Sequence, residues 1–274
     1  MGAYLIPLMN SFLRTCVDYL QFYISAFPAS GHGIHSPFVY QFAREVLRDK
    51  TAFDDYQIWQ QWREGLRHDN TFLPIVELGA GSTTAPDRDA RRVADLAARV
   101  SKPPRTGRLL YRIARYYKPH HVIELGTSLG LSTALFSLAR PEASILTIEG
   151  NWAVAEKAQA NFDHWGCSNV TMVKGNFDEC LAAVLEKLPG IDLAFLDGNH
   201  RKEPTLRYFE QLLLKKHSDS IFIVDDIHWS AEMKAAWQAI KQHPDVRCTI
   251  DLFQVGLVFF KQEFKEVRHF CIRF

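Results

Sequence analysis

Cysteine is scarce in this sequence, and none of it stands at a spacing that suggests a cross-link or a metal site. The five cysteines are scattered, and no two are separated by only two residues. A disulfide framework uses an even set at short spacings and a zinc ribbon uses C-x-x-C pairs, so both are disfavoured. Scattered cysteines are typical of a reducing compartment, and we expect a cytoplasmic protein.

Long apolar runs and an excess of one charge are also missing. No apolar stretch approaches the ~18 residues of a membrane span, and 32 Lys and Arg against 31 Asp and Glu leave a net charge of +1. We therefore predict no membrane partner, and nucleic acid is disfavoured as a partner. The first 25 residues lack a basic start and carry Asn10, Arg14 and Asp18 within their apolar stretch. We expect a buried amphipathic helix there rather than a signal peptide.

From residue 105 onward, short apolar runs alternate with segments of helical character. The runs lie at 121–126, 145–150, 170–175, 191–198 and 221–226. Continuous apolar strands separated by helices indicate a parallel sheet covered on both faces. The tail is different, because 248–261 predicts two strands around a turn near 254–256 and 266–274 predicts a further strand or closing edge. The predicted fold is an α/β doubly wound sheet, mostly parallel, with an antiparallel C-terminal end.

The first 104 residues do not show this alternation of strands and helices. We expect one helix to about Ile24, a second from Pro37 to Arg48 that begins at its proline, and a third within 51–69. The segment before the Pro103–Pro104 break is rich in Pro and Arg and predicts a short strand, a loop and one helix. We divide the chain into a helical cap, 1–104, packed on a sheet domain, 105–274.

Two glycine strings resemble each other, at 75–82 (IVELGAGS) and 122–130 (VIELGTSLG). Each suits a strand and a tight turn that presents backbone N–H groups to a nucleotide. Only the second is followed at once by a helix, with Ser132 as its candidate N-cap. Only the second also has an acid, Glu149, at the end of the next strand and 19 residues beyond Gly130, near the ~20-residue spacing at which a carboxylate meets ribose hydroxyls. We predict a nucleoside cofactor at 122–130 and a structural loop at 75–82.

The spacing of the glycines limits the cofactor. Gly126 and Gly130 form G-x-x-x-G rather than G-x-G-x-x-G, and the loop contains no lysine. A ligand with a ribose but no diphosphate suits this loop, whereas a P-loop and a nicotinamide dehydrogenase are disfavoured.

Acidic residues close two of the predicted strands. Asp197 ends the run at 191–198, and Asp225 and Asp226 end the run at 221–226. The carboxyl ends of neighbouring strands form the ligand crevice of an open sheet, and three carboxylates there need a cation or a proton. We predict a site for Mg²⁺ or a similar hard dication. The alternatives are that Asp225 or Asp226 caps a helix, or that Asp197 binds only the amino group of the cofactor.

His200, three residues after Asp197, is the candidate general base, because imidazole titrates near neutral pH. The alternative is a loop histidine bonded to the backbone. His228 and Trp229 either line an acceptor pocket or are packed, which we favour.

For a pair of histidines and a row of arginines we favour a structural role over a functional one. His32 and His35 suit a metal pair, a lid over the acceptor or an ordinary helix start, and we favour the last. Arg108, Arg112 and Arg115 form one helical face, which we expect to be solvated rather than to bind RNA.

Together, E-L-G-x-S-x-G with its strand-end acid, F-L-D-G and I-V-D-D resemble the class I S-adenosylmethionine-dependent methyltransferases. The nearest branch is that of the catechol and caffeoyl-coenzyme A O-methyltransferases, and the resemblance covers about residues 105–260. It implies a Rossmann-like sheet of seven strands and a cofactor held by residues of several strand ends. Those lining the methionine end would be Glu124, Gly126, Ser128 and Gly130, with Glu149 on the ribose and Gly175 and Asn176 against the adenine.

The resemblance also bears on the acceptor side. The metal-dependent members carry Asp, Asp and Asn as ligands, whereas this chain has Asp226 in the third place. Their lysine base corresponds to His200 here. We expect methyl transfer to a small hydroxylated acceptor, with Mg²⁺ as a second cofactor. The alternatives are a metal-independent methyltransferase acting on a sugar, lipid or RNA, and a cofactor-binding protein without catalysis. The oligomeric state is left open, a homodimer included.

Overall fold

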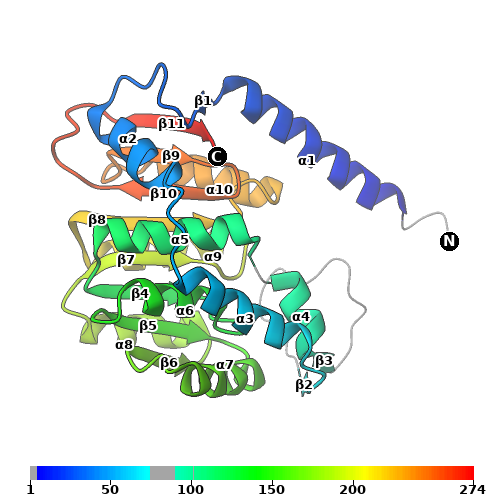
Figure 1. The fold of residues 1–274 in the computed structure, drawn as a ribbon. Coiled ribbons are helices and arrows are strands. Elements are labelled where there is room, and N and C mark those ends of the chain that lie inside the picture. The colour runs from blue at the N-terminus through cyan, green and yellow to red at the C-terminus, as the bar shows by residue number, and fades with distance from the viewer. Residues whose placement is uncertain (1–4, 75–89, 101) are drawn as a thin grey trace.

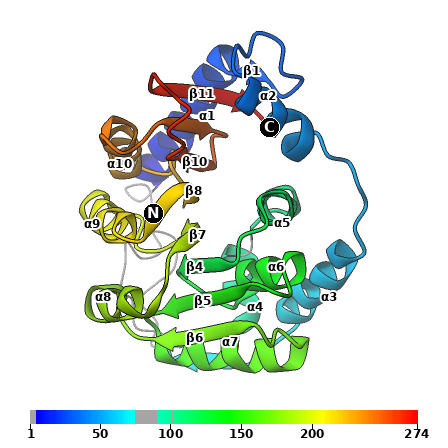
Figure 2. The same cartoon turned by 90° about the vertical axis from the view of Figure 1, so that its left-hand side faces the viewer.

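The protein is built on one large sheet. The computed structural model describes residues 5–74, 90–100 and 102–274, so the glycine string at 75–82 lies outside the described residues. Nine strands are hydrogen-bonded in the order β1-β11-β9-β10-β8-β7-β4-β5-β6. Figure 2 shows this sheet with β6 at one end and β11 with β1 at the other.

Five consecutive strands form the parallel part of the sheet. They are β4 (His121–Leu125), β5 (Ser144–Glu149), β6 (Val170–Lys174), β7 (Ile191–Leu196) and β8 (Lys216–Asp225). The hairpin strand β10 (Val255–Phe259) is antiparallel to both β8 and β9 (Cys248–Asp251). The predicted fold class, mostly parallel with an antiparallel C-terminal end, is confirmed.

The sheet has two more strands than the resemblance implied. Beyond β9, the strand β11 (Arg268–Arg273) pairs parallel with it, and β1 (Phe27–Pro28) pairs parallel with β11. The count of seven is therefore wrong for this chain. An edge strand exposes unpaired backbone groups, and the predicted tail strand together with the residues after the first helix covers the edge of β9.

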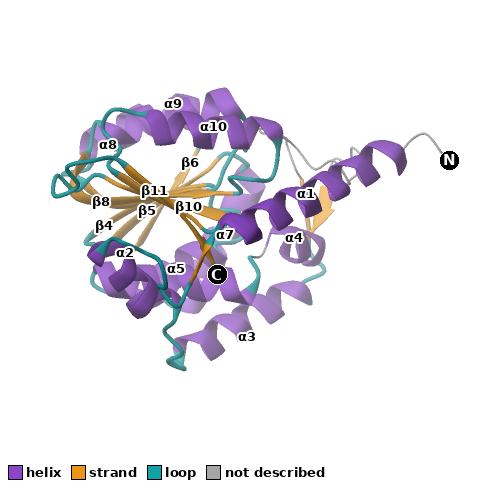
Figure 3. Ribbon diagram, turned by 90° about the horizontal axis from the view of Figure 1, so that it is seen from above, coloured by secondary structure: helices purple, strands orange, loops and turns teal. Residues whose placement is uncertain are grey.

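Helices cover both faces of the sheet (Figure 3). One face carries α5 (Pro104–Tyr117) and α6 (Leu131–Ala139), and the other carries α8 (Phe177–Lys187), α9 (Lys202–Leu213) and α10 (Ala231–Gln242), as Figure 2 shows. The helix α7 (Trp152–Trp165) packs against α6 and contacts β5 and β6. Successive strand residues point to opposite faces, so Val122 joins the core under α5 and Ile123 the core under α9.

The chain before α5 packs on the α5 face. The helix α2 (Pro37–Phe42) begins at its proline, as predicted, and continues as a π-helical turn, η1 (Ala43–Leu47). The next helix, α3 (Asp55–Arg67), is tied to α6 by Trp59, whose Nε1 donates to the Leu131 carbonyl (3.0 Å). Two short antiparallel strands, β2 (Phe72–Pro74) and β3 (Ala90–Arg92), then lead into α4 (Val93–Val100).

The N-terminal helix is not buried, so that prediction is wrong. In α1 (Leu5–Ser25), Leu20 is 59% and Ile24 75% exposed, and Phe22 alone among the large apolar side chains from residue 13 on is buried. Figure 1 shows α1 extending away from the sheet. Apolar residues surround this helix, while the rest of the chain contacts only one side of it, so most of them stay exposed. No helix in the described ranges is long and apolar enough to cross a membrane.

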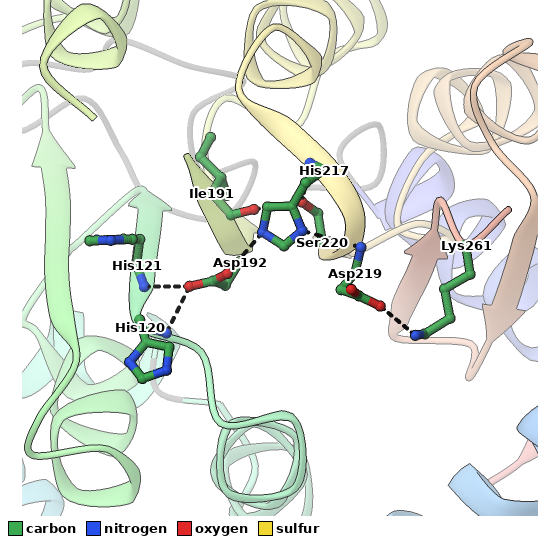
Figure 4. Close-up of polar contacts among 8 residues, drawn as sticks. All are labelled: His120, His121, Ile191, Asp192, His217, Asp219, Ser220 and Lys261. Carbon is green, nitrogen blue, oxygen red and sulfur yellow. Dashed lines mark hydrogen bonds and ion pairs between the residues drawn. The ribbon is translucent and has the colours of Figure 1, made fainter. Parts of the chain in front are cut away.

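Asp192 joins three strands at the amino-terminal edge of the sheet (Figure 4). Its Oδ2 accepts the N–H groups of His120 (2.8 Å) and His121 (2.7 Å) at the start of β4, and its Oδ1 lies 2.8 Å from Nε2 of His217 on β8. Burial opposes ionisation, but these donors outweigh it and hold the pKa of Asp192 below its usual value. The carboxylate therefore stabilises the fold at the edge away from the strand-end acids.

We expect Asp192→Asn to lower the free energy of unfolding by about 1–3 kcal/mol at pH 7, because two backbone donors and His217 lose a charged acceptor. The folded pKa lies below the unfolded one, so this stability is present above pH ~4 and is lost as the pH falls through the folded pKa. Urea unfolding at pH 7 and at pH 3 measures both effects.

The matched control is Asp219→Asn. Asp219 pairs with Lys261 in the same cluster (2.5 Å), but its side chain is 67% exposed. Exposed pairs contribute little, so this variant should unfold like the wild type. A loss in Asp192→Asn no greater than that in Asp219→Asn at pH 7 would contradict the role given to Asp192.

Candidate active site

The loop after β4 makes a close turn that requires its two glycines. Gly126 and Gly130 have φ of 102° and 86°. A Cβ on Gly126 would collide with the Asp197 carbonyl oxygen, and one on Gly130 would lie 2.5 Å from the Phe162 ring. Positive φ and close approach together leave glycine as the fitting residue at both positions. The loop is thereby pressed against the end of β7.

Glu149 holds this loop from the end of β5. Its Oε2 accepts the Ser128 N–H and its Oε1 accepts the Asn151 N–H, both at 2.8 Å. Burial raises the pKa of Glu149 against these backbone donors. A carboxylate has about four acceptor positions, so two hydrogen bonds leave capacity for ligand hydroxyls. The structure thus brings the predicted ribose acid and the glycine loop together.

Glu124 lies underneath the loop and not at its surface. Its side chain is fully buried and accepts hydrogen bonds from Ser132 Oγ (2.5 Å), Thr147 Oγ1 (2.7 Å) and Thr133 Oγ1. Burial raises the pKa of this carboxyl, and the three hydroxyls oppose that rise. Its evident role is to fix the start of α6 against β5. The prediction of Ser132 as N-cap is wrong: Gly130 holds that position, and the serine hydroxyl turns to Glu124.

The next strand end adds Gly175 and Asn176. The N–H of Gly175 donates to the Glu149 carbonyl (2.9 Å), which places the two strand ends side by side. Asn176 Oδ1 accepts the Asp178 N–H (3.0 Å) and caps α8. The predicted adenine residues therefore lie on the same edge as Glu149.

A lysine that the sequence analysis missed joins two of the predicted acids. Lys102 Nζ lies 2.9 Å from Asp197 Oδ1, and it also bonds to Asp225 Oδ2. The side chains of Lys102, Asp197 and Asp225 are 17%, 15% and 2% exposed. Burial lowers the pKa of Lys102, but the carboxylates outweigh it and raise the pKa overall. The ammonium is thus the cation that compensates these strand ends.

The arrangement does not fit the predicted Mg²⁺ site. Asp226 follows with φ of 53°, and burial and the charge of Asp225 raise its pKa to about 7. Among the described residues, no group of three His, Cys, Asp or Glu is arranged to hold a metal. A dication between Asp197 and Asp225 would need the place that the ammonium fills. The arrangement therefore does not support the predicted Mg²⁺ site on Asp197, Asp225 and Asp226.

His200 stands beside this cluster on a constrained turn. Asn199 and His200 have φ of 68° and 43°, which are uncommon for residues other than glycine. His200 Nε2 lies 3.6 Å from Asp197 Oδ1, and its ring centroid lies 5.8 Å from that of Trp229. Burial lowers the pKa of His200, Asp225 opposes that change and Lys102 adds to it. Burial thus favours the neutral imidazole, the form that accepts a proton.

The other candidate histidines lie elsewhere. His228 stacks on Phe253 (centroids 4.9 Å apart, 8° between planes) and contacts Asp251 Oδ2 (2.8 Å), so it is packed, as favoured. The same expectation is wrong for Trp229, whose side chain is exposed. His32 and His35 are exposed, and the His35 carbonyl accepts from Arg268 (3.3 Å) at the amino end of β11. That end lies at the edge opposite to Asp197, so the segment is not a lid over this site.

The arginine face of α5 is solvated only in part: Arg112 is buried and Arg108 half-buried, so the prediction of a solvated face is wrong for these two, whereas Arg115 is exposed as predicted. Arg112 is buried, and its Nη1 donates to the Asp49 carbonyl (3.2 Å). Arg108 lies over the Tyr56 ring (5.1 Å) and Arg115 over Phe53 (4.7 Å). Guanidinium groups stack well on aromatic faces, and the aromatic residues of and before α3 supply those faces.

Comparison with known proteins agrees with this geometry. Residues 123–227 match a family model described as a methyltransferase domain. The chain is 27% identical over 131 residues to a catechol O-methyltransferase of Niastella koreensis, an alignment that covers 47% of this chain. The chain spans only 58% of the length of that enzyme.

Solved structures share the fold. A methyltransferase of Podospora anserina, bound to S-adenosylhomocysteine, aligns over 84% of this chain and 97% of its own, with 16% identity and a TM-score of 0.56. An O-methyltransferase of Bacillus cereus, in complex with the same compound, aligns over 81% and 97%, with 17% identity and a TM-score of 0.53. The predicted resemblance is confirmed: residues 123–227 match the methyltransferase-domain family model, and the chain shares its fold with solved O-methyltransferases.

Proposed function

We propose that this protein transfers the methyl group of S-adenosylmethionine to a hydroxyl group of a small acceptor. The observation that carries the proposal is the meeting of two sites at one edge of the sheet. Glu149 and the glycine loop form the first, and Asp197 with His200 forms the second. The Gly126 backbone packs against the Asp197 carbonyl, so the two sites adjoin. The methyltransferase match over 123–227 and the catechol O-methyltransferase relative support the same activity.

The first site suits the nucleoside part of this cofactor. The Glu149 carboxylate would accept the ribose hydroxyls, and Gly175 with Asn176 would border the adenine. Ser128 and the two glycines would line the methionine end, with Glu124 fixing them from below. When bound, S-adenosylmethionine supplies a methyl group on a positively charged sulfur, which an oxygen nucleophile can displace. Because the molecule has no diphosphate, the G-x-x-x-G loop suits it.

The second site suits a hydroxyl group that must lose its proton. His200 lies beside Asp197 in surroundings that favour its neutral form, so its imidazole can accept the acceptor's proton as the oxygen attacks. Trp229, which is 45% exposed beside His200, would form a wall for a small ring. Displacement between two bound groups depends on their alignment, which the rigid strand ends provide.

We propose that methyl transfer does not require a divalent metal. Mg²⁺ assistance would require the ammonium of Lys102 to leave Asp197 and Asp225, so the geometry favours the metal-independent route. A small acceptor remains the proposal over a sugar, a lipid or RNA because the catechol O-methyltransferase relative acts on a small ring, as its name states.

Glu149→Ala should weaken the binding of S-adenosylhomocysteine by about 1–3 kcal/mol, because the ribose hydroxyls and the loop N–H lose a charged acceptor. Isothermal titration calorimetry measures this change. The matched control is Glu156→Ala, since Glu156 is exposed and pairs with Lys174 on a neighbouring element. Equal affinities in wild type and Glu149→Ala would refute the cofactor site.

His200→Gln should lower turnover by roughly 10²–10⁴-fold at neutral pH, as expected for loss of a general base. The affinity for S-adenosylhomocysteine should stay unchanged, because His200 lies outside the nucleoside site. The assay follows S-adenosylhomocysteine formation across a panel of phenols and catechols. His32→Ala, an exposed histidine of the same chain, is the control and should keep wild-type turnover. A His200→Gln enzyme with wild-type turnover would remove the base from the mechanism.

A further inference from the structure

We infer that Lys102 is the built-in cation of the acceptor site, standing where the metal-dependent relatives would place a divalent ion. The inference rests on the proposed function and deepens it. Asp197 and Asp225 end two neighbouring parallel strands, β7 and β8, and both carboxylates are nearly covered. Two buried carboxylates at adjacent strand ends repel each other unless a cation separates them. Lys102 reaches both from a point 95 and 123 residues away in the sequence.

The fold holds Lys102 in place. The helix α5 begins at Pro104, two residues after it. The first turn of α5 is fixed by Thr106 Oγ1, which donates to Gln254 Oε1 (2.7 Å) in the turn before β10. The ammonium also lies 5.9 Å from the centre of the Phe195 ring on β7. Lys102 is therefore held at both ends: the start of α5 fixes its backbone, and Asp197, Asp225 and the Phe195 ring fix its ammonium group.

An ammonium and a dication differ in what they can do here. An ammonium has three N–H donors, and two of them are used by Asp197 and Asp225. Counted over the part of the chain that the structure describes, one donor remains for a single acceptor oxygen. Mg²⁺ would instead take about six oxygen ligands and bind two oxygens of one acceptor at once. The structure therefore assigns a substrate class: acceptors that need one hydroxyl, with no advantage from a vicinal pair.

The weaker charge of the ammonium also explains why a base stands next to it. A dication strongly lowers the pKa of a bound hydroxyl, whereas a single N–H donor mainly orients it. In the proposed step the acceptor oxygen forms a bond to the methyl carbon, and the carbon–sulfur bond breaks with its electron pair on sulfur. The hydroxyl proton passes to His200 Nε2, and Lys102 holds the oxygen in line. Lys102 is thus a positioning residue for the acceptor.

The first test uses Mn²⁺ alone and needs no acceptor. Electron paramagnetic resonance should detect no Mn²⁺ bound to the wild type, because the ammonium fills the position between the carboxylates. Lys102→Ala exposes those carboxylates and should bind Mn²⁺, and Lys102→Ala with Asp225→Asn should lose it again. Lys50→Ala, an exposed lysine, is the control and should behave like the wild type. Wild-type binding of Mn²⁺ that Asp225→Asn abolishes would overturn the inference.

The second test uses turnover. The wild type should be equally active in EDTA and in Mg²⁺, and it should methylate phenol-type and catechol-type acceptors with similar kcat/KM. Lys102→Met, which keeps an unbranched apolar stem, should lose roughly 10²–10³-fold in kcat, the usual effect of removing one preorganised donor. Its affinity for S-adenosylhomocysteine should be unchanged. Added Mg²⁺ should restore part of the activity that Lys102→Ala loses, and it should leave the wild-type activity of Lys50→Ala unchanged.

The outcomes separate the inference from the proposed function. Loss of wild-type turnover in EDTA, or a strong preference for vicinal diols, overturns the role of Lys102 while the methyltransferase remains. A wild type that binds no S-adenosylhomocysteine overturns the proposed function, and the Mn²⁺ result then still decides whether Lys102 fills the cation position. If circular dichroism shows Lys102→Ala to be unfolded, the Mn²⁺ test uses Lys102→Met and the double variant Lys102→Met with Asp225→Asn instead. The first should bind Mn²⁺, and the second should not, because it removes the Asp225 charge that Lys102→Met leaves unpaired.

Discussion

The lysine that bridges Asp197 and Asp225 is the interaction on which this site depends. The carboxyl-terminal halves of β7 and β8 are buried on both faces, so the carboxylates at their ends have little water to stabilise them. The ammonium of Lys102 supplies the missing charge, and removing one partner of such a buried set is costly because the others stay uncompensated. The position of α5, which follows Lys102, is thereby linked to the ends of the two strands.

The backbone links these acids to the glycine loop after β4. Gly126 lies so close to the Asp197 carbonyl that no side chain fits between them. Glu149 then anchors the same loop from β5, and Glu124 anchors the start of α6 beneath it. Loop, acids and lysine therefore form one rigid assembly, which is the condition for aligning a donor methyl group with an acceptor oxygen.

Local sequence patterns were enough to predict the sheet. Apolar runs followed by glycine or acid marked β4 to β8, and the spacing from Gly130 to Glu149 placed both at one edge. Lys102 could not be found in this way, because no local pattern links it to acids far along the chain. The burial of α1 was mispredicted because apolar composition does not reveal how many sides of a helix meet the protein. Arg108 and Arg112 were misjudged because their partners, the Tyr56 ring and the Asp49 carbonyl, lie far back in the sequence, in and before α3.

The two edges of the sheet divide stability from function. At the amino edge, Asp192 gathers β4, β7 and β8 with hydrogen bonds from backbone and from His217, so the carboxylate is satisfied by donors that are part of the fold. At the carboxyl edge, the acids of the same β7 and β8 are satisfied by one lysine whose third donor is uncommitted to them. Carboxylates of one sheet thus serve two purposes. At the amino edge, the backbone and His217 donors fix Asp192, and Asp192 fixes the strands. At the carboxyl edge, Asp197 and Asp225 hold Lys102, whose remaining N–H has no acceptor among the described residues and is the one that we propose for the substrate.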